Sequence, residues 1–363
     1  MKIYNFGAGP SMLPEEVVIK AKQELEDGFE KGMTFMERSH RSSEYEAVHN
    51  NAIKLIRELM GVPDNYEVLL LQGGGSQQFA MTAMNLMTKN KKADYIVTGV
   101  WAKKALDEAK KIGDARGENT SEDTNFSKLP DMAHLKIRDD VDYVYMTTNN
   151  TIYGTSIHAE KIPTYIKAPL VADMSSNILS EPYNVKDFGL IFAGAQKNLG
   201  ISGVTLVILN PEILGDTSGL PKIFDYKTHI EANSIYNTPP TYAIFILNLV
   251  LEHLKQTGSV SAAAKRNKAK ADLLYGFLDE SKLFKAVACK EDRSFMNVCF
   301  VTGDKALDEK CVNAAKEKGI IGIKGHRKVG GLRASIYNAM PIEGVKYLTD
   351  FLKEFEKGHV KNV

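Results

Sequence analysis

Apolar runs alternate with helical patterns between residues 67 and 209. Runs rich in branched and aromatic side chains predict strands at residues 67–71, 95–98, 142–147, 169–173, 190–193 and 204–209. Amphipathic spacing predicts helices between them, for example over residues 102–112. Continuous apolar strands connected by helices are typical of a mostly parallel sheet covered on both faces. We expect the polar segment 114–128 to be a surface loop.

The pattern changes after residue 240. A strongly apolar helix is predicted over residues 242–256, with Thr238 as its N-cap, and Gly258-Ser259 ends that block. Beyond it, helices are expected at residues 265–277, 308–318 and 342–357, and strands at residues 294–301 and 333–337. This alternation predicts a smaller α+β domain at the C-terminal end.

Composition narrows the class of protein. The 363 residues suggest two domains, and 46 Lys plus Arg against 45 Asp plus Glu give a net charge of +1, which argues against wholesale binding to nucleic acid or a membrane surface. The most apolar stretch, residues 243–251, is far shorter than the ~20 residues of a membrane span. The N-terminus lacks the apolar stretch of a secretory signal, so we expect a soluble, cytoplasmic protein. The three cysteines form no Cys-x-x-Cys pair, so neither a disulfide framework nor a metal site is expected.

Candidate chemistry lies where the predicted strands end, since ligands of open α/β sheets bind at the carboxyl ends of strands. Gly73-Gly74-Gly75-Ser76 follows the first strand and precedes a helix, which suits an anion, although a plain turn is an equally good interpretation. Asp173 ends another strand, and Lys197 follows the next one along the chain. Most such aspartates cap helices or turns. A lysine at the end of a buried strand is less ordinary, because its charge is costly to desolvate.

Asp173 and Lys197 together suggest pyridoxal phosphate. That cofactor needs a lysine to bind its aldehyde, a carboxylate at its ring nitrogen and an anion site for its phosphate. It also needs a flat partner for its ring, and Trp101, the single tryptophan, follows a strand end. Core packing is the ordinary role of a lone tryptophan. The placement of all these residues at strand ends of one predicted sheet favours the cofactor.

Two cationic segments form a second group of candidates. His40 and Arg41 lie near the N-terminus, and His326 and Arg327 lie near the C-terminus, shortly before Arg333 at the start of a strand. Solvated basic loops are the alternative interpretation. Arginine binds carboxylates in a bidentate way, and a His-Arg pair suits a phosphate, so the set fits a substrate that carries both groups.

The sequence resembles the phosphoserine aminotransferases, class V enzymes of fold type I that use pyridoxal phosphate. The resemblance runs through Asn5-Phe6-Gly7-Ala8-Gly9-Pro10, Ser39-His40-Arg41-Ser42, Gln72-Gly73-Gly74-Gly75, residues 171–176, Gly194-Ala195-Gln196-Lys197-Asn198, Asn237-Thr238-Pro239-Pro240-Thr241, Gly325-His326-Arg327 and residues 333–339. It implies a large domain (residues 16–258) with a mostly parallel seven-stranded sheet, and a small α+β domain made of residues 1–15 and 259–363.

The resemblance also implies a role for each site residue. Lys197 binds the cofactor and moves the substrate α-proton, Asp173 pairs with the ring nitrogen, Trp101 stacks on the ring, and Thr151 bonds the ring hydroxyl. The cofactor phosphate is held by Gly75, Ser76, Ser175 and Gln196, together with Asn237 and Thr238 of a second subunit. Arg333 grips the substrate carboxylate. His326 and Arg327, with His40 and Arg41 of the second subunit, bind the substrate phosphate or the side-chain carboxylate of glutamate.

The expected function is therefore transamination between O-phospho-L-serine and 2-oxoglutarate by a homodimer with shared active sites, giving 3-phosphooxypyruvate and L-glutamate. The same family also handles 4-phosphohydroxythreonine for pyridoxine synthesis. The main alternative is another reaction on this scaffold, such as a cysteine desulfurase with Cys289 as its nucleophile or an alanine–glyoxylate-type aminotransferase. A nicotinamide dehydrogenase is disfavoured because no Gly-x-Gly-x-x-Gly occurs. A non-catalytic binding protein is disfavoured by the Lys197–Asp173 pair and the arginines.

Overall fold

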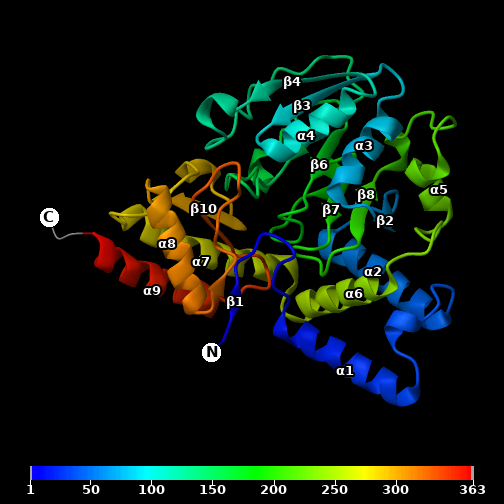
Figure 1. The fold of residues 1–363 in the computed structure, drawn as a ribbon. Helices are drawn as coiled ribbons and strands as arrows, with labels where there is room; N and C mark the ends of the chain where they lie inside the picture. Colours follow the sequence, from blue (N-terminus) through cyan, green and yellow to red (C-terminus); the bar gives the residue numbers. More distant parts are fainter. Residues whose placement is uncertain (1, 361–363) are drawn as a thin grey trace.

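A seven-stranded sheet forms the centre of the molecule (Figure 1). The computed structural model describes residues 2–360. The sheet has the order β2-β8-β7-β6-β5-β3-β4, and its strands are β2 (Glu67–Leu71), β3 (Lys92–Val97), β4 (Asp114–Thr120), β5 (Tyr143–Thr147), β6 (Leu170–Asp173), β7 (Leu190–Gly194) and β8 (Thr205–Leu209). Strands β4, β3, β5, β6 and β7 are parallel neighbours, and β8 is antiparallel to both β7 and β2. The predicted mostly parallel sheet is confirmed.

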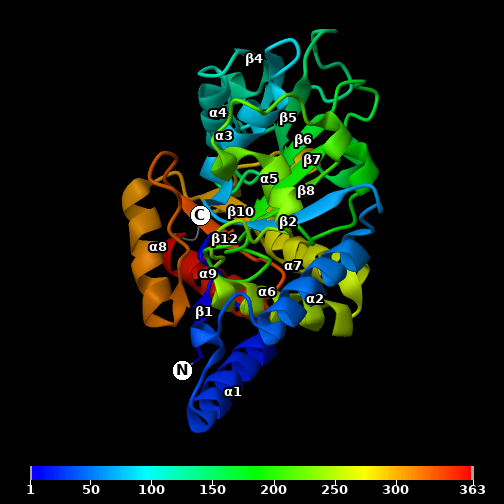
Figure 2. The same cartoon turned by 90° about the vertical axis from the view of Figure 1, so that its right-hand side faces the viewer.

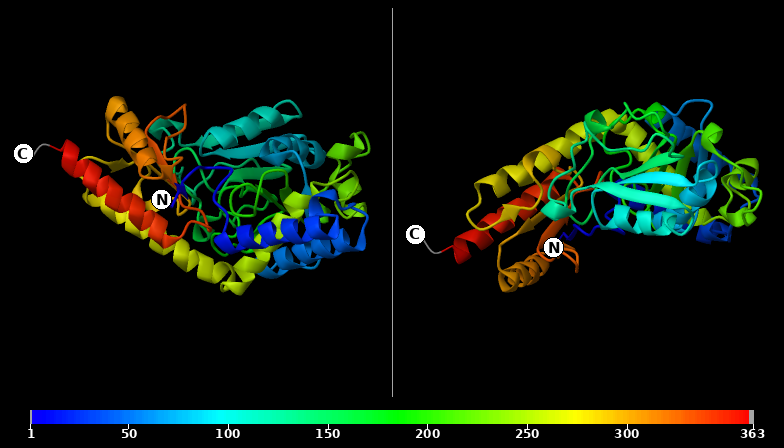
Figure 3. Two further views of the ribbon diagram at one scale, coloured as in Figure 1. Left: turned by 60° about the horizontal axis from the view of Figure 1, so that its bottom comes forward. Right: turned by 90° about the horizontal axis from the view of Figure 1, so that it is seen from above.

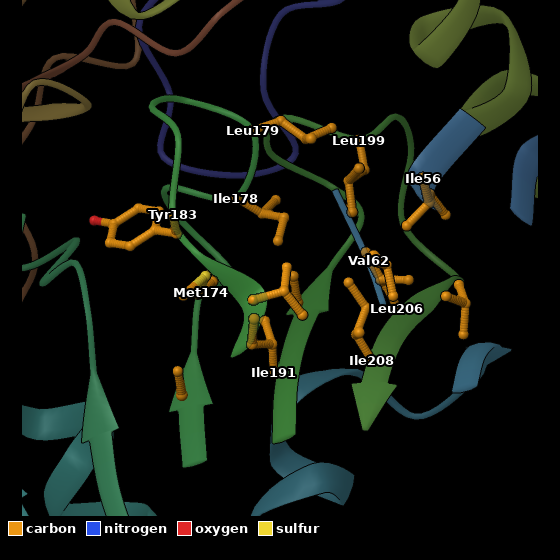
Figure 4. Close-up of a cluster of buried hydrophobic side chains, with 14 of the residues drawn as sticks. Ile56, Val62, Met174, Ile178, Leu179, Tyr183, Ile191, Leu199, Leu206 and Ile208 are labelled. Atoms are coloured by element: carbon orange, nitrogen blue, oxygen red, sulfur yellow. The ribbon is translucent and has the colours of Figure 1, made fainter. Parts of the chain in front are cut away.

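Helices cover both faces of this sheet. They are α1 (Glu15–Lys31), α2 (Ser43–Met60), α3 (Gly74–Leu86), α4 (Val100–Ala109), α5 (Tyr226–Glu231), α6 (Thr241–Gln256), α7 (Ser259–Glu280), α8 (Lys305–Glu317) and α9 (Ile342–His359). Because successive strand residues point to opposite faces, Leu69 and Leu71 pack with α3 and α4, whereas Val68 and Leu70 pack with α2 and α6. Figure 4 shows side chains of the core between the sheet and helices α2 and α6, such as Ile56 on α2, which lies against the strands. In Figure 2, α1 lies beside α6 outside this layer.

Two expectations from the sequence are wrong. Residues 114–120, expected to be a loop, form the edge strand β4, which pairs in parallel with β3. An edge strand can keep polar side chains in solvent, so its sequence lacks the apolar run that marks the inner strands. Thr238 is not the N-cap of the apolar helix, because α6 begins at Thr241 after Pro240 and has no side-chain cap.

The C-terminal part of the chain has a core of its own. A three-stranded antiparallel sheet, β12-β10-β9, packs with α7, α8 and α9, and a parallel pair joins β1 to β11. These strands are β1 (Tyr4–Asn5), β9 (Lys285–Ala286), β10 (Asn297–Val301), β11 (Ile320–Ile321) and β12 (Leu332–Ser335). Figure 3 shows α7 and α9 side by side along this part. We propose the domain division expected from the sequence on the basis of these separate cores.

Residues 6–11, which we call the N-terminal crossing segment, connect the two parts. At one end, the Phe6 amide donates to the Ile321 carbonyl (2.8 Å) and the Phe6 carbonyl accepts from Ser335. At the other end, the Ser11 amide donates to the carbonyl of Gln196 at 2.9 Å. The segment therefore runs from the C-terminal sheet to the loop after β7. Within residues 2–360, no helix has the length and apolarity needed to cross a membrane.

Candidate active site

Lys197 lies in the loop that follows β7, at the carboxyl edge of the large sheet. Its Nζ donates a hydrogen bond to Thr151 Oγ1 at 3.0 Å, and Thr151 follows the end of β5. Burial lowers the pKa of Lys197 to about 8, the charge of Asp173 raises it, and that of Arg333 lowers it further. A substantial fraction of this amine is therefore neutral, and able to accept a proton, near physiological pH.

Asp173 is the last residue of β6, and its side chain is only 6% exposed. It lies on the same face of the sheet as Val171, which packs in the core beneath α3 and α4. Its Oδ1 accepts a hydrogen bond from the Ser175 amide at 2.9 Å. Burial raises the pKa of the Asp173 carboxyl, while Ser175 and the charge of Lys197 oppose that rise. A buried carboxylate with so few partners in the chain is suited to a cationic ligand atom.

The glycine turn after β2 leads directly into α3. Gly73 and Gly74 have φ values of +86° and +66°, a conformation that side chains disfavour. The Gly74 amide donates to Thr205 Oγ1 at 2.8 Å. A Cβ on Gly75 would lie 3.8 Å from Ser175 Oγ, so the turn and Ser175 face one another closely. The first amides of α3, next to Ser76, have no acceptor within the helix, which suits an anion.

Trp101 lies in the first turn of α4, immediately beyond the end of β3. Its Nε1 is buried and has no hydrogen-bond partner among the residues that the structure describes. Gly99, two residues earlier, is so close to Asn150 that a Cβ there would lie 2.6 Å from its Oδ1. This close approach brings the start of α4 next to the turn that carries Thr151.

Arg333 enters the same region from β12 in the C-terminal part. Its Nη1 donates to the Thr151 carbonyl at 3.2 Å, and its Nε is buried without a partner among the described residues. Thr151 thus contacts both Lys197 and Arg333. His326 and Arg327 lie in the turn between β11 and β12. Burial lowers the pKa of His326, and so do the charges of Arg333, Lys328, Arg327 and Lys104.

The remaining candidates lie elsewhere in the single chain. Ser42 caps α2, and His40 and Arg41 precede this cap. Within residues 2–360, neither forms a hydrogen bond or an ion pair with Lys197 or Arg333. Asn237 and Thr238 are exposed, and the carbonyl of Thr238 accepts a hydrogen bond from Gln72 Nε2 at 2.8 Å, next to the glycine turn. The Gln196 side chain folds back toward Gly194, where a Cβ would meet its Oε1 at 2.6 Å.

Sequence reasoning missed two residues that support the site. Ser11 Oγ donates to the carbonyl of Lys197 at 2.6 Å, and Thr205 binds the glycine turn. A serine after Pro10 gives no local signal of this contact, and Thr205 reaches the turn only because β8 runs antiparallel and begins at the ligand edge. Within residues 2–360, no group of three or more His, Cys, Asp and Glu side chains could hold a metal ion.

The residues present fit pyridoxal phosphate. The amine of Lys197 can bind an aldehyde, and the buried Asp173 can face a protonated ring nitrogen. The amides at the start of α3 and the Ser175 hydroxyl can hold a phosphate, and the indole of Trp101 can cover a ring. The unpartnered Trp101 Nε1 is consistent with a polar ligand at this position.

The chain is similar to known proteins of one family over nearly its whole length. The aminotransferase class-V family matches residues 3–348. A phosphoserine aminotransferase of Bacillus cereus is 50% identical over 356 residues, 98% of both chains, and one of Nitrosomonas europaea is 47% identical over 99% of both. The solved phosphoserine aminotransferase of Bacillus circulans subsp. alkalophilus has a TM-score of 0.95 at 42% identity, over 99% of both chains. The pyridoxal-phosphate-bound enzyme of Trichomonas vaginalis has a TM-score of 0.88 at 33% identity, over 97% of this chain and 100% of that one.

Proposed function

The chain belongs to the class-V aminotransferase family, and from this we propose that it is a pyridoxal-phosphate-dependent phosphoserine aminotransferase. It exchanges the amino group between O-phospho-L-serine and 2-oxoglutarate, which gives 3-phosphooxypyruvate and L-glutamate. The observation that carries the proposal is the contact of Thr151 with both the Lys197 amine and the Arg333 guanidinium. Through Thr151, the amine that can carry a proton and the guanidinium that can bind a carboxylate lie in one site, and Arg333 also acts on His326 nearby.

Lys197 is the proposed proton carrier. When bound, pyridoxal phosphate supplies an electron-withdrawing ring that accepts the electron pair left by the substrate α-proton. With its pKa of about 8, the Lys197 amine can take that proton from the substrate α-carbon. It can then deliver the proton to the carbon on the other side of the transferred amino nitrogen. Asp173 keeps a proton on the ring nitrogen, because a buried carboxylate is stabilised by a cation beside it.

The cations are proposed to position the substrate. Arg333, held by its bond to the Thr151 carbonyl, binds the α-carboxylate that every substrate of the reaction carries. His326 and Arg327 bind the phosphate of phosphoserine or the distal carboxylate of glutamate. The same contacts suit 4-phosphohydroxy-L-threonine, so we also propose a contribution to pyridoxine biosynthesis beside serine biosynthesis in the cytoplasm.

The holoenzyme is proposed to be a homodimer with shared sites. His40, Arg41, Asn237 and Thr238 reach the neighbouring subunit's site in this proposal. It is supported by the exposure of Arg41, Asn237 and Thr238, and because His40 and Arg41 form no hydrogen bond or ion pair with this chain's own Lys197 and Arg333 among the described residues. Mixing the inactive variants Lys197→Ala and Arg41→Ala after reversible dissociation tests it. A mixed dimer would hold one intact site, so about a quarter of the wild-type activity should return at equal mixing. No recovery, with dimers re-formed, would refute shared sites.

The cysteine desulfurase alternative is not favoured. Such an enzyme needs a reactive thiolate, whereas burial and the neighbouring Asp292 raise the pKa of Cys289 to about 11. Burial also raises the pKa of Cys299 and that of Cys311 to about 12. All three sulfurs are therefore protonated at neutral pH.

An absorbance titration tests the main proposal. Purified holoenzyme should lose its visible absorption on addition of phosphoserine and regain it on addition of 2-oxoglutarate, since each half-reaction moves the amino group on or off the cofactor. Lys197→Ala should abolish turnover, with Lys103→Ala as the exposed control. A fully active Lys197→Ala variant, or a wild-type spectrum indifferent to phosphoserine, would refute it.

A further inference from the structure

Lys104 is an exposed lysine at the rim of the site, and the proposed reaction leaves it without a role. It lies one helical turn after Trp101 on α4, and its Nζ is 4.6 Å from the centre of the Trp101 ring. An ammonium at this distance is attracted to the aromatic face, which limits the positions that the flexible side chain adopts. Lys104 is therefore held on the tryptophan that borders the proposed cofactor site.

Lys104 also differs from its neighbour Lys103 in its partners. Lys103 pairs with Glu122, with 2.7 Å between Nζ and Oε1. Among the residues that the structure describes, no ion pair of Lys104 with a carboxylate is found. The two adjacent lysines thus provide a natural comparison: Lys103 is paired with an acidic residue, whereas Lys104 lies over the Trp101 ring.

The surroundings of Lys104 are strongly cationic. The charges of Arg333, Lys328, Arg327 and Lys104 all lower the pKa of His326, so these four cations act on one imidazole. Like charges repel, so such a group of cations raises the free energy of the site. A multiply charged anion relieves this repulsion when it binds.

We propose that Lys104 is a specificity-determining residue that favours the phosphorylated substrate over glutamate. A phosphate monoester carries a charge of about −2 near neutral pH, whereas the side-chain carboxylate of glutamate carries −1. A nearby ammonium therefore stabilises the phosphorylated substrate about twice as strongly. This inference rests on the proposed function, and it adds Lys104 on helix α4 to the phosphate-binding cations proposed above.

The size of the effect follows from the exposure of the lysine. Solvent screens an exposed ion pair, so one charge contributes much less than a buried bidentate arginine does. We expect Lys104→Gln to lower kcat/KM for phosphoserine by about two- to fivefold. Because the interaction with the single charge of glutamate is about half as strong, kcat/KM for glutamate should fall by only about 1.4- to 2.2-fold. Lys104→Arg should retain most of the preference, and Lys103→Gln should leave both values unchanged.

The experiment compares the holoenzymes of these variants in the two half-reactions, at low and at high salt. In wild-type protein and in Lys103→Gln, high salt should lower kcat/KM for phosphoserine more than kcat/KM for glutamate. In Lys104→Gln, this difference between the two substrates should be smaller. Inhibition of the glutamate half-reaction by inorganic phosphate is measured in parallel. Its inhibition constant should rise in Lys104→Gln by the same factor as the loss with phosphoserine.

Several outcomes would overturn the inference. Equal losses for both substrates would show that Lys104 acts through Trp101 and not on the phosphate. Unchanged values in Lys104→Gln would show that it has no role in specificity. If the wild-type enzyme does not react with phosphoserine, the proposed function fails, and inhibition by inorganic phosphate then still decides whether Lys104 binds a phosphate.

Discussion

The protonation of Lys197 depends on two neighbours with opposite effects. The direction in which a mutation of either neighbour shifts the pKa of Lys197 can therefore be predicted. Burial brings the pKa of Lys197 from its ordinary value of 10.5 to about 8, Asp173 raises it and Arg333 lowers it. Asp173→Asn removes the attraction for the ammonium, so the pKa of Lys197 should fall below that of the wild type. Arg333→Gln removes a repulsion, so the pKa should rise.

The effect on reactivity is large. With a pKa of about 8, roughly a tenth of the Lys197 amines are neutral at pH 7. With the ordinary pKa of 10.5, only about 0.03% would be neutral at that pH. The site therefore increases the reactive form of this amine by about 300-fold relative to an exposed lysine.

Competitive labelling measures the neutral fraction of the Lys197 amine directly. Cofactor-free protein is treated with trace acetic anhydride between pH 6 and pH 11, and mass spectrometry follows the peptide that contains Lys197, with an exposed lysine of the same digest as reference. The labelling midpoint should lie near pH 8 in the wild type, lower in Asp173→Asn and higher in Arg333→Gln. A wild-type midpoint near that of exposed lysines, or shifts of both variants in one direction, would refute the electrostatic account.

Three further predictions concern substrate binding, stability and the sulfur chemistry. Arg333→Lys should lower kcat/KM for phosphoserine and for glutamate alike, by about 10- to 100-fold, because lysine cannot form the bidentate pair with a carboxylate. If steady-state assays show a loss for only one substrate, Arg333 does not bind the α-carboxylate that both substrates carry. Lys270, 2% exposed, donates to three carbonyls, and burial lowers its pKa to about 7. Below pH 7 the buried ammonium of Lys270 destabilises the fold, and this penalty disappears as the pH rises from 7 toward 10.5. In urea unfolding, the free energy of unfolding of the wild type should therefore increase by about 2 kcal/mol relative to that of Lys270→Met between pH 7 and pH 9. A difference between the two proteins that stays constant with pH would contradict this prediction. Cys289→Ser should transaminate normally, and sulfide release from cysteine by the wild type would disprove the inert state of its thiol.

The sequence predicts the inner strands well because each is a local apolar run. Residues 67–71, 190–193 and 204–209 fall on β2, β7 and β8 within one residue at either end. Asp173 and Lys197 are identified by the same signal, since a polar side chain directly after such a run lies at the ligand edge of the sheet. Signals of this kind need only a few consecutive residues.

Features that depend on distant contacts do not have such a signal. The direction of β8 brings Thr205 to Gly74, yet its apolar run looks like that of a parallel strand. Strand β4 is polar because it is at the sheet edge. The contact of Arg333 with Thr151 joins residues 182 apart in sequence. The residue pattern marks Arg333 as a candidate for binding a carboxylate, but it does not indicate this contact.

The N-terminal crossing segment has a consequence for the order of folding. Its contacts join residues near the start of the chain to Gln196, Ile321 and Ser335, so each closes a very long loop. Contacts of high sequence separation form late, after the surfaces they need exist. The backbone around Lys197 therefore gains its last partner, Ser11, only once both cores have assembled, and a newly made chain acquires a complete reaction centre as one of its final steps.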